Sequence, residues 1–269
     1  MKRFFCFFAS VLLSFKAQAF EPISLKAEGE NACSAFYVYG ERCSGTNFVK
    51  ELILQNTGMK HLTWCHKHFP PWYDLGPENW HGNKRYYTHS DCSKLLFVIV
   101  VRDVYDWVRS LNTEPHHAAR HLWKMPISEF IRSPWILDYE DKTVASEVLK
   151  HPYMDVNPVT KQPFENVFKL RAAKTREYMK IFEMLPNVVF VRYEEVRDDP
   201  EGFLAMVESV FGIGLNPEFT SIDRYKGCPY WRPFIPKVYA PFLVEDLDYI
   251  NSQLDQPLET SLGYKIKQP

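Results

Sequence analysis

The sequence predicts an α/β fold in a single domain, with a central parallel sheet flanked by helices. Two apolar runs, 35–39 and 95–101, are each followed by a segment with helical spacing, as in the strand–helix units of α/β proteins. The second run holds seven consecutive apolar residues, which is typical of a parallel strand covered on both faces. A chain of 269 residues suits one such domain, and no repeat or linker divides it.

The expected elements alternate along the chain. Short apolar and aromatic runs indicate the strands, and apolar residues recurring every three or four positions indicate the helices. The stretches 66–94 and 113–164 are long and rich in Pro, Trp, Tyr and His, so we expect functional loops or insertions there. We expect strands at 35–39, near 61–65, at 95–101 and at 188–193, and helices at 46–56, 103–112, 165–184, 200–211 and 244–254.

The first strand leads into a turn that is typical of an anion-binding loop. Residues 40–47 read Gly-Glu-Arg-Cys-Ser-Gly-Thr-Asn. Small residues let the backbone turn its N–H groups toward an anion, and the helix that follows adds partial positive charge. The spacing of Gly40 and Gly45 matches a Walker A loop, but Thr46 stands where that loop has Lys. The loop therefore argues against an ATP or GTP hydrolase and favours another enzyme that holds a phosphorylated donor.

A second anion contact is expected at the end of strand 95–101. Arg102 follows this strand directly, at the edge where open α/β sheets bind ligands. Ser110 lies eight residues further on, about two turns along the expected helix. A guanidinium and a hydroxyl held in this way can grip one phosphate together.

In this order, the two motifs resemble those of the sulfotransferases that use 3′-phosphoadenosine 5′-phosphosulfate (PAPS). Residues 44–48 resemble the loop that holds the 5′-phosphosulfate, and Arg102 and Ser110 fall on the 3′-phosphate motif. The segment 188–196, followed by Asp199-Pro200, resembles a late strand and Tyr-Glu turn of that family. The resemblance covers roughly residues 35–265 and implies a P-loop NTPase-like sulfotransferase fold, with the domain at 33–266.

The resemblance also implies which residues hold the donor. Phe48 and Tyr193 match positions beside the adenine, and 224–227 resembles a C-terminal Arg-Lys-Gly segment with one residue inserted. Soluble members carry a Lys directly before Ser-Gly-Thr; here Cys43 takes that place and Arg42 precedes it, so Arg42 is the candidate cation at the 5′ end. The implied donor-binding residues are Arg42, Cys43, Ser44, Gly45, Thr46, Asn47, Phe48, Arg102, Ser110, Tyr193, Arg224, Lys226 and Gly227.

A catalytic base is implied by a further segment. Residues 66–70, His-Lys-His-Phe-Pro, resemble the family's Lys-Thr-His-Leu-Pro, which carries the catalytic histidine. The match points to His68 as the general base. Arg42, the candidate cation at the 5′ end of the donor, is the other predicted catalytic residue. His titrates near neutral pH and suits the deprotonation of a hydroxyl acceptor. His66 and a carboxylate stay open as alternatives.

The predicted function is transfer of a sulfuryl group from PAPS to a hydroxyl or amine acceptor, such as a glycan or another small molecule, with adenosine 3′,5′-bisphosphate (PAP) as product and without a metal. One alternative is a P-loop nucleoside or nucleotide kinase, which would need a Lys after Gly45 and a carboxylate for Mg²⁺. The other is a non-catalytic exported protein that binds a glycan or nucleotide on the same fold. A net charge of −1 gives no general attraction to nucleic acid.

The N-terminus is typical of a secretory signal peptide. Lys2-Arg3 precedes the apolar stretch 4–15, and Ala17-Gln18-Ala19 matches a cleavage site. The apolar stretch is short for a bilayer span, so we expect cleavage of 1–19, no stable membrane span afterwards, and a secretory or extracytoplasmic location. The compartment stays open, because PAPS is made in the cytosol.

Export would make disulfides possible. The odd number of cysteines after cleavage leaves at least one thiol unpaired, and Cys43 in the anion loop is the expected one. The remaining cysteines beyond the signal peptide are Cys33, Cys65, Cys92 and Cys228.

Overall fold

The computed structural model describes residues 20–29, 32–62, 67–68, 92–138, 155–157, 159–224 and 232–268. Several expectations lie outside these residues. They are the signal peptide 1–19, the alternative base His66, the donor-binding Lys226 and Gly227, and the cysteines Cys65 and Cys228.

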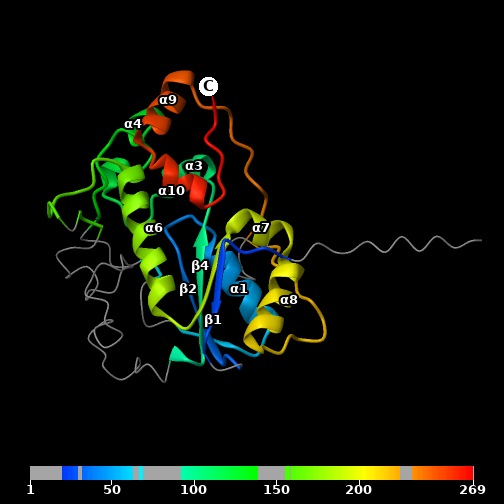
Figure 1. Cartoon of the computed structure of the whole chain (residues 1–269). Helices are drawn as coiled ribbons and strands as arrows, with labels where there is room; N and C mark the ends of the chain where they lie inside the picture. The colour runs from blue at the N-terminus through cyan, green and yellow to red at the C-terminus, as the bar shows by residue number, and fades with distance from the viewer. Residues whose placement is uncertain are drawn as a thin grey trace, which may run out of the picture.

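The chain forms one α/β domain around a five-stranded sheet in the order β1-β5-β4-β2-β3 (Figure 1). Neighbouring strands from β5 to β3 run parallel, as expected. The prediction of a parallel sheet is wrong at one edge, where β1 pairs antiparallel with β5. The sheet is therefore mixed. The strands are β1 (Ser24–Ala27), β2 (Ala35–Tyr39), β3 (Lys60–His61), β4 (Leu95–Val101) and β5 (Asn187–Arg192).

The long helices lie where the sequence predicts them, with small shifts set by their caps. Asp103 accepts hydrogen bonds from the N–H groups of Tyr105 and Asp106, and Asn166 caps its helix in the same way. Both caps therefore lie outside the helix bodies. The helices are α1 (Thr46–Asn56), α3 (Val104–Thr113), η2 (Arg120–Leu122), α4 (Ile127–Phe130), α6 (Val167–Met184), α7 (Tyr193–Asp198), α8 (Pro200–Phe211), α9 (Val244–Gln253) and α10 (Gln256–Ser261).

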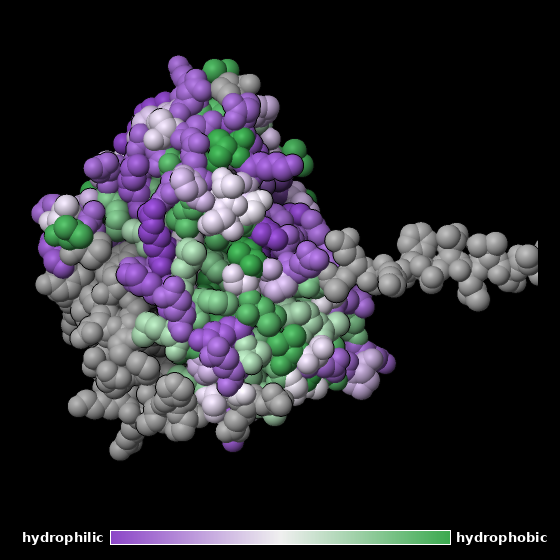
Figure 2. All heavy atoms as spheres, viewed as in Figure 1, coloured by the Kyte–Doolittle hydropathy of each residue, from purple (hydrophilic) through white to green (hydrophobic). Residues whose placement is uncertain are grey.

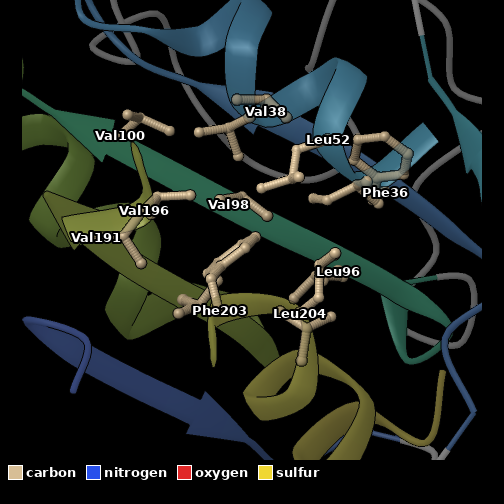
Figure 3. Close-up of a cluster of buried hydrophobic side chains, with 14 of the residues drawn as sticks. Phe36, Val38, Leu52, Leu96, Val98, Val100, Val191, Val196, Phe203 and Leu204 are labelled. Atoms are coloured by element: carbon tan, nitrogen blue, oxygen red, sulfur yellow. The ribbon is translucent and has the colours of Figure 1, made fainter. Parts of the chain in front are cut away.

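Helices cover both faces of the sheet, which explains the unbroken apolar run of β4. Successive strand residues point to opposite faces. On one face, Phe36 and Val98 pack with Leu52 of α1 and Phe203 of α8 (Figure 3). On the other face, the alternate residues of β2 and β4 pack with α6, through the cluster Tyr37, Tyr39, Phe97, Ile99, Tyr178 and Ile181.

The parallel strands place three candidate segments at one edge of the sheet. The loop 40–45 follows β2, Arg102 follows β4, and α7 begins with Tyr193 directly after β5. Because carboxyl ends of parallel strands meet at the same edge, these segments converge there. A third core cluster, formed mainly by α3, α4, α6 and α9, packs beyond that edge.

Candidate functional site

A cavity of about 440 Å³ lies at the carboxyl edge of the sheet and joins most of the predicted site residues. It also takes in Lys67, Glu114, His116 and an extended segment, 232–239, that the sequence did not indicate. The predicted residues that line it are Cys43, Gly45, Thr46, Asn47, Phe48, His68, Arg102, Ser110, Tyr193 and Arg224.

The anion loop depends on a glycine at position 45. Gly45 has φ 93° and precedes α1 as its N-cap, so no side chain caps the first N–H groups of the helix. An added Cβ would lie 2.1 Å from the ring of Tyr193, which packs edge-on against Phe48 at 5.8 Å. The loop, the start of α1 and the Tyr193 ring therefore form one closely packed wall of the cavity.

Replacing Gly45 with alanine should damage this wall. A left-handed conformation costs a non-glycine residue on the order of 1–3 kcal/mol, and the Tyr193 ring must also move. We expect a lower free energy of unfolding in urea and weaker binding of an anionic ligand. Gly58→Ala is the control, because a Cβ at Gly58 meets no atom within 4 Å. If Gly45→Ala behaves like this control, the loop does not need its left-handed geometry.

Arg102 is held beside the anion loop. Its Nη1 donates a hydrogen bond of 3.1 Å to the carbonyl of Cys43, and its guanidinium lies 5.2 Å from the centre of the Tyr193 ring. The thiol of Cys43 donates to the carbonyl of Glu114 at 3.6 Å, and it is also hydrogen-bonded to Ser110 on α3. Burial raises the pKa of that thiol to about 11, against the opposing effect of this hydrogen bond. Cys43 is thus a neutral thiol at physiological pH, and it forms no disulfide, as expected; Cys33 is likewise a free cysteine.

Arg42 lies outside the cavity. It is fully buried, and its Nη1 pairs with Glu41 at 2.9 Å and with Asp155 at 2.7 Å. Arg42 therefore exposes no surface with which it could contact the donor as predicted. Ser44 is also buried and does not line the cavity, although its hydroxyl oxygen has no hydrogen-bond partner among the residues that the structure describes.

His68 and Lys67 are tied to the loop through Gly40. The N–H of Gly40 donates to the carbonyl of Lys67 at 3.1 Å, and the carbonyl of Gly40 lies 2.7 Å from Nδ1 of His68. A carbonyl only accepts, so Nδ1 carries the proton and the lone pair of the neutral ring is on Nε2. The Nζ of Lys67 donates to Oδ1 of Asn47 on α1. Lys67 thereby brings a cation to the start of α1, where the sequence had suggested Arg42.

A further part of the cavity lining comes from the segment 232–239. The segment forms neither a helix nor a strand, so its sequence carries no helical or strand periodicity that could have indicated it. Arg224 pairs with Pro233 in an isolated bridge at its base. Beyond its other end, Arg109 of α3 donates to the carbonyl of Ala240 and lies 3.7 Å from the centre of the Phe242 ring.

The cavity is strongly cationic, although the whole chain carries a net charge of −1. Among the described residues, five Lys and Arg side chains line it against one carboxylate, that of Glu114. Such a lining favours a ligand with several negative charges. The five cations are Lys67, Arg102, Arg224, Arg232 and Lys237.

Within the described ranges, no group of three or more His, Cys, Asp or Glu side chains is arranged to hold a metal. None of the helices described there is long and apolar enough to cross a membrane. Comparisons with models of protein families, with curated proteins and with solved structures found no match to this chain.

Proposed function

We propose that the protein is a sulfotransferase that moves a sulfuryl group from PAPS to a hydroxyl or amine acceptor, on a P-loop-like sulfotransferase fold. One observation carries the proposal: the loop at the start of α1, the Arg102–Ser110 pair and His68 line the same cavity. Two candidate anion contacts in one cavity suit a donor with phosphate groups at its 3′ and 5′ ends. A histidine in the same cavity suits an acceptor that must lose a proton.

The donor is placed by matching its charges to the cavity. Its 5′-phosphosulfate lies against the N–H groups of 45–47 at the start of α1, where partial positive charge is concentrated. Its 3′-phosphate meets Arg102 and Ser110. The rings of Phe48 and Tyr193 flank the adenine. Lys67, next to Asn47, supplies the cation at the 5′ end.

In the reaction, the acceptor oxygen or nitrogen attacks sulfur while the bond from sulfur to the phosphate oxygen breaks. The acceptor proton passes to Nε2 of His68, and PAP leaves with the electron pair of the broken bond. Negative charge grows on the departing 5′-phosphate, and Lys67 and the α1 N–H groups offset it. In-line positioning of donor and acceptor supplies the rest of the rate.

A kinase is the first rival, and ligand binding separates the two. Thr46 stands in place of the Walker Lys, and Arg102 follows β4 in place of a carboxylate. We therefore expect PAP to raise the melting temperature in EDTA, and ATP with Mg²⁺ to raise it little. Adenosine is the control for binding through the base alone. A large shift with ATP and Mg²⁺ that EDTA abolishes would favour the kinase.

We further propose that the protein is exported through cleavage of 1–19 and acts in the secretory pathway or outside the cytoplasm. A non-catalytic binding protein is the second rival. It would bind PAP without releasing it from PAPS in the presence of any acceptor.

A further inference from the structure

Helix α6 carries two buried cations, each of which holds the backbone of a cavity residue. Nη2 of Arg171 donates to the carbonyl of Arg102 at 2.8 Å, and Nζ of Lys174 donates to the carbonyl of His68 at 3.0 Å. Arg171 is 3% exposed and Lys174 is 0% exposed, and neither lines the cavity. The outward side of α6 is hydrophilic in Figure 2. Arg171 and Lys174 differ from the polar residues on that side because their side chains are buried inside the protein.

Arg171 is fixed by a carboxylate of α10. Its Nε lies 2.6 Å from Oε1 of Glu259, and its Nη2 lies 2.9 Å from Oε2. This two-point pairing sets the plane of the guanidinium. The same Nη2 then reaches the carbonyl of Arg102, where β4 ends. The position of the Arg102 backbone is thus linked to α6 and α10.

Lys174 belongs to a ring of four buried charges. Its Nζ lies 2.5 Å from Glu41 and 2.5 Å from Asp155, and Arg42 bridges the same two carboxylates. Burial alone would raise the pKa of Asp155, but Arg42 and Lys174 lower it to about 2, so this carboxylate is ionised. With the carbonyl of His68, three oxygen atoms lie within 3.0 Å of the ammonium.

We propose that α6 positions both ends of the site: Arg171 sets Arg102 for anion binding, and Lys174 sets His68 for proton transfer. Both are positioning residues, because neither reaches the cavity. They lie three positions apart on one helix, so they share a face and fix two segments from distant parts of the chain relative to each other. The inference rests on the proposed function for the roles of Arg102 and His68.

Two matched variants test it, each removing one cation together with the charge of one carboxylate that pairs with it. Arg171→Met with Glu259→Gln should weaken PAP binding about tenfold while kcat changes little. Lys174→Met with Asp155→Asn should leave the Kd for PAP nearly unchanged and lower kcat about 100-fold, the cost of misplacing a reacting group. If either pair fails to fold, Arg171→Lys and Lys174→Arg keep the charge and change only the geometry of the donors.

A readout independent of turnover separates this inference from the proposed function. The ring ¹⁵N signals of His68 report its tautomer, and they should change in the Lys174 variant and stay as in wild type in the Arg171 variant. If wild type does not bind PAP, the proposed function fails, and these signals still test the positioning. If both variants alter PAP affinity, kcat and the His68 signals alike, the cations only stabilise the fold, and the inference is overturned.

Discussion

His68→Ala should lower turnover by about two to four orders of magnitude, the usual share of general-base catalysis, while PAP affinity stays nearly unchanged. His68 lines the cavity, and its Nδ1 is bonded to Gly40, so Nε2 is the nitrogen that can accept the acceptor's proton. Release of PAP from PAPS, followed with a panel of glycans, phenols and peptides, measures the effect. The panel must first yield an acceptor that wild type sulfates.

Two other residues of the same cavity serve as controls for His68. His116→Ala should cost much less, since its Nε2 lies 3.2 Å from the carboxylate of Glu114. Glu114→Gln tests the carboxylate alternative, because Glu114 is the carboxylate that lines the cavity among the described residues. Turnover like that of wild type in His68→Ala, together with an inactive Glu114→Gln, would assign the base to the carboxylate. A loss of PAP binding in His68→Ala would make its role structural.

Arg102→Ala should weaken PAP binding by about 1.5–3 kcal/mol, the contribution of a charge-assisted contact. Binding of adenosine 5′-phosphosulfate, which lacks the 3′-phosphate, should change far less. The reason is that Arg102 and Ser110, which both line the cavity, are assigned to the 3′-phosphate, whereas the N–H groups at the start of α1 are assigned to the 5′-phosphosulfate. Calorimetric titration of wild type and variant with both ligands gives the comparison.

The control for Arg102 is the arginine on the same aromatic ring. Arg197 lies 5.7 Å from the centre of the Tyr193 ring, but it does not line the cavity. Arg197→Ala should therefore leave the affinity for both ligands as in wild type. Equal losses for PAP and adenosine 5′-phosphosulfate in Arg102→Ala would contradict the assignment of Arg102 to the 3′-phosphate, and would indicate that the loop at Cys43 has moved instead.

The strands and long helices were predictable because their burial leaves a periodic record in the sequence. The strand 95–101 and the helices 46–56 and 200–211 have the predicted bounds. β1 was not predicted, because its four residues alternate between half-buried and exposed positions and so give only a weak hydrophobic pattern. The short helices α4, α7 and α10 were not predicted either, because one or two turns are too few to show helical spacing of apolar residues.

The site was predictable where it follows directly from strand ends. Gly45, Arg102 and Ser110 lie in the cavity because topology alone brings their segments together. Arg42 could not be placed from sequence, because its direction is set by Asp155, over a hundred positions away. Lys67 was likewise missed: its neighbour His68 matched a motif, but nothing local shows that the Lys67 side chain reaches Asn47.

The most direct test of the central claim is a structure of the protein with PAP bound. We expect one molecule in the cavity, with its 5′-phosphate against the N–H groups at the start of α1 and its 3′-phosphate on Arg102 and Ser110. The imidazole of His68 should face the side of the 5′-phosphate from which an acceptor would approach. PAP bound elsewhere, or bound here with its 3′-phosphate away from Arg102, would contradict the account.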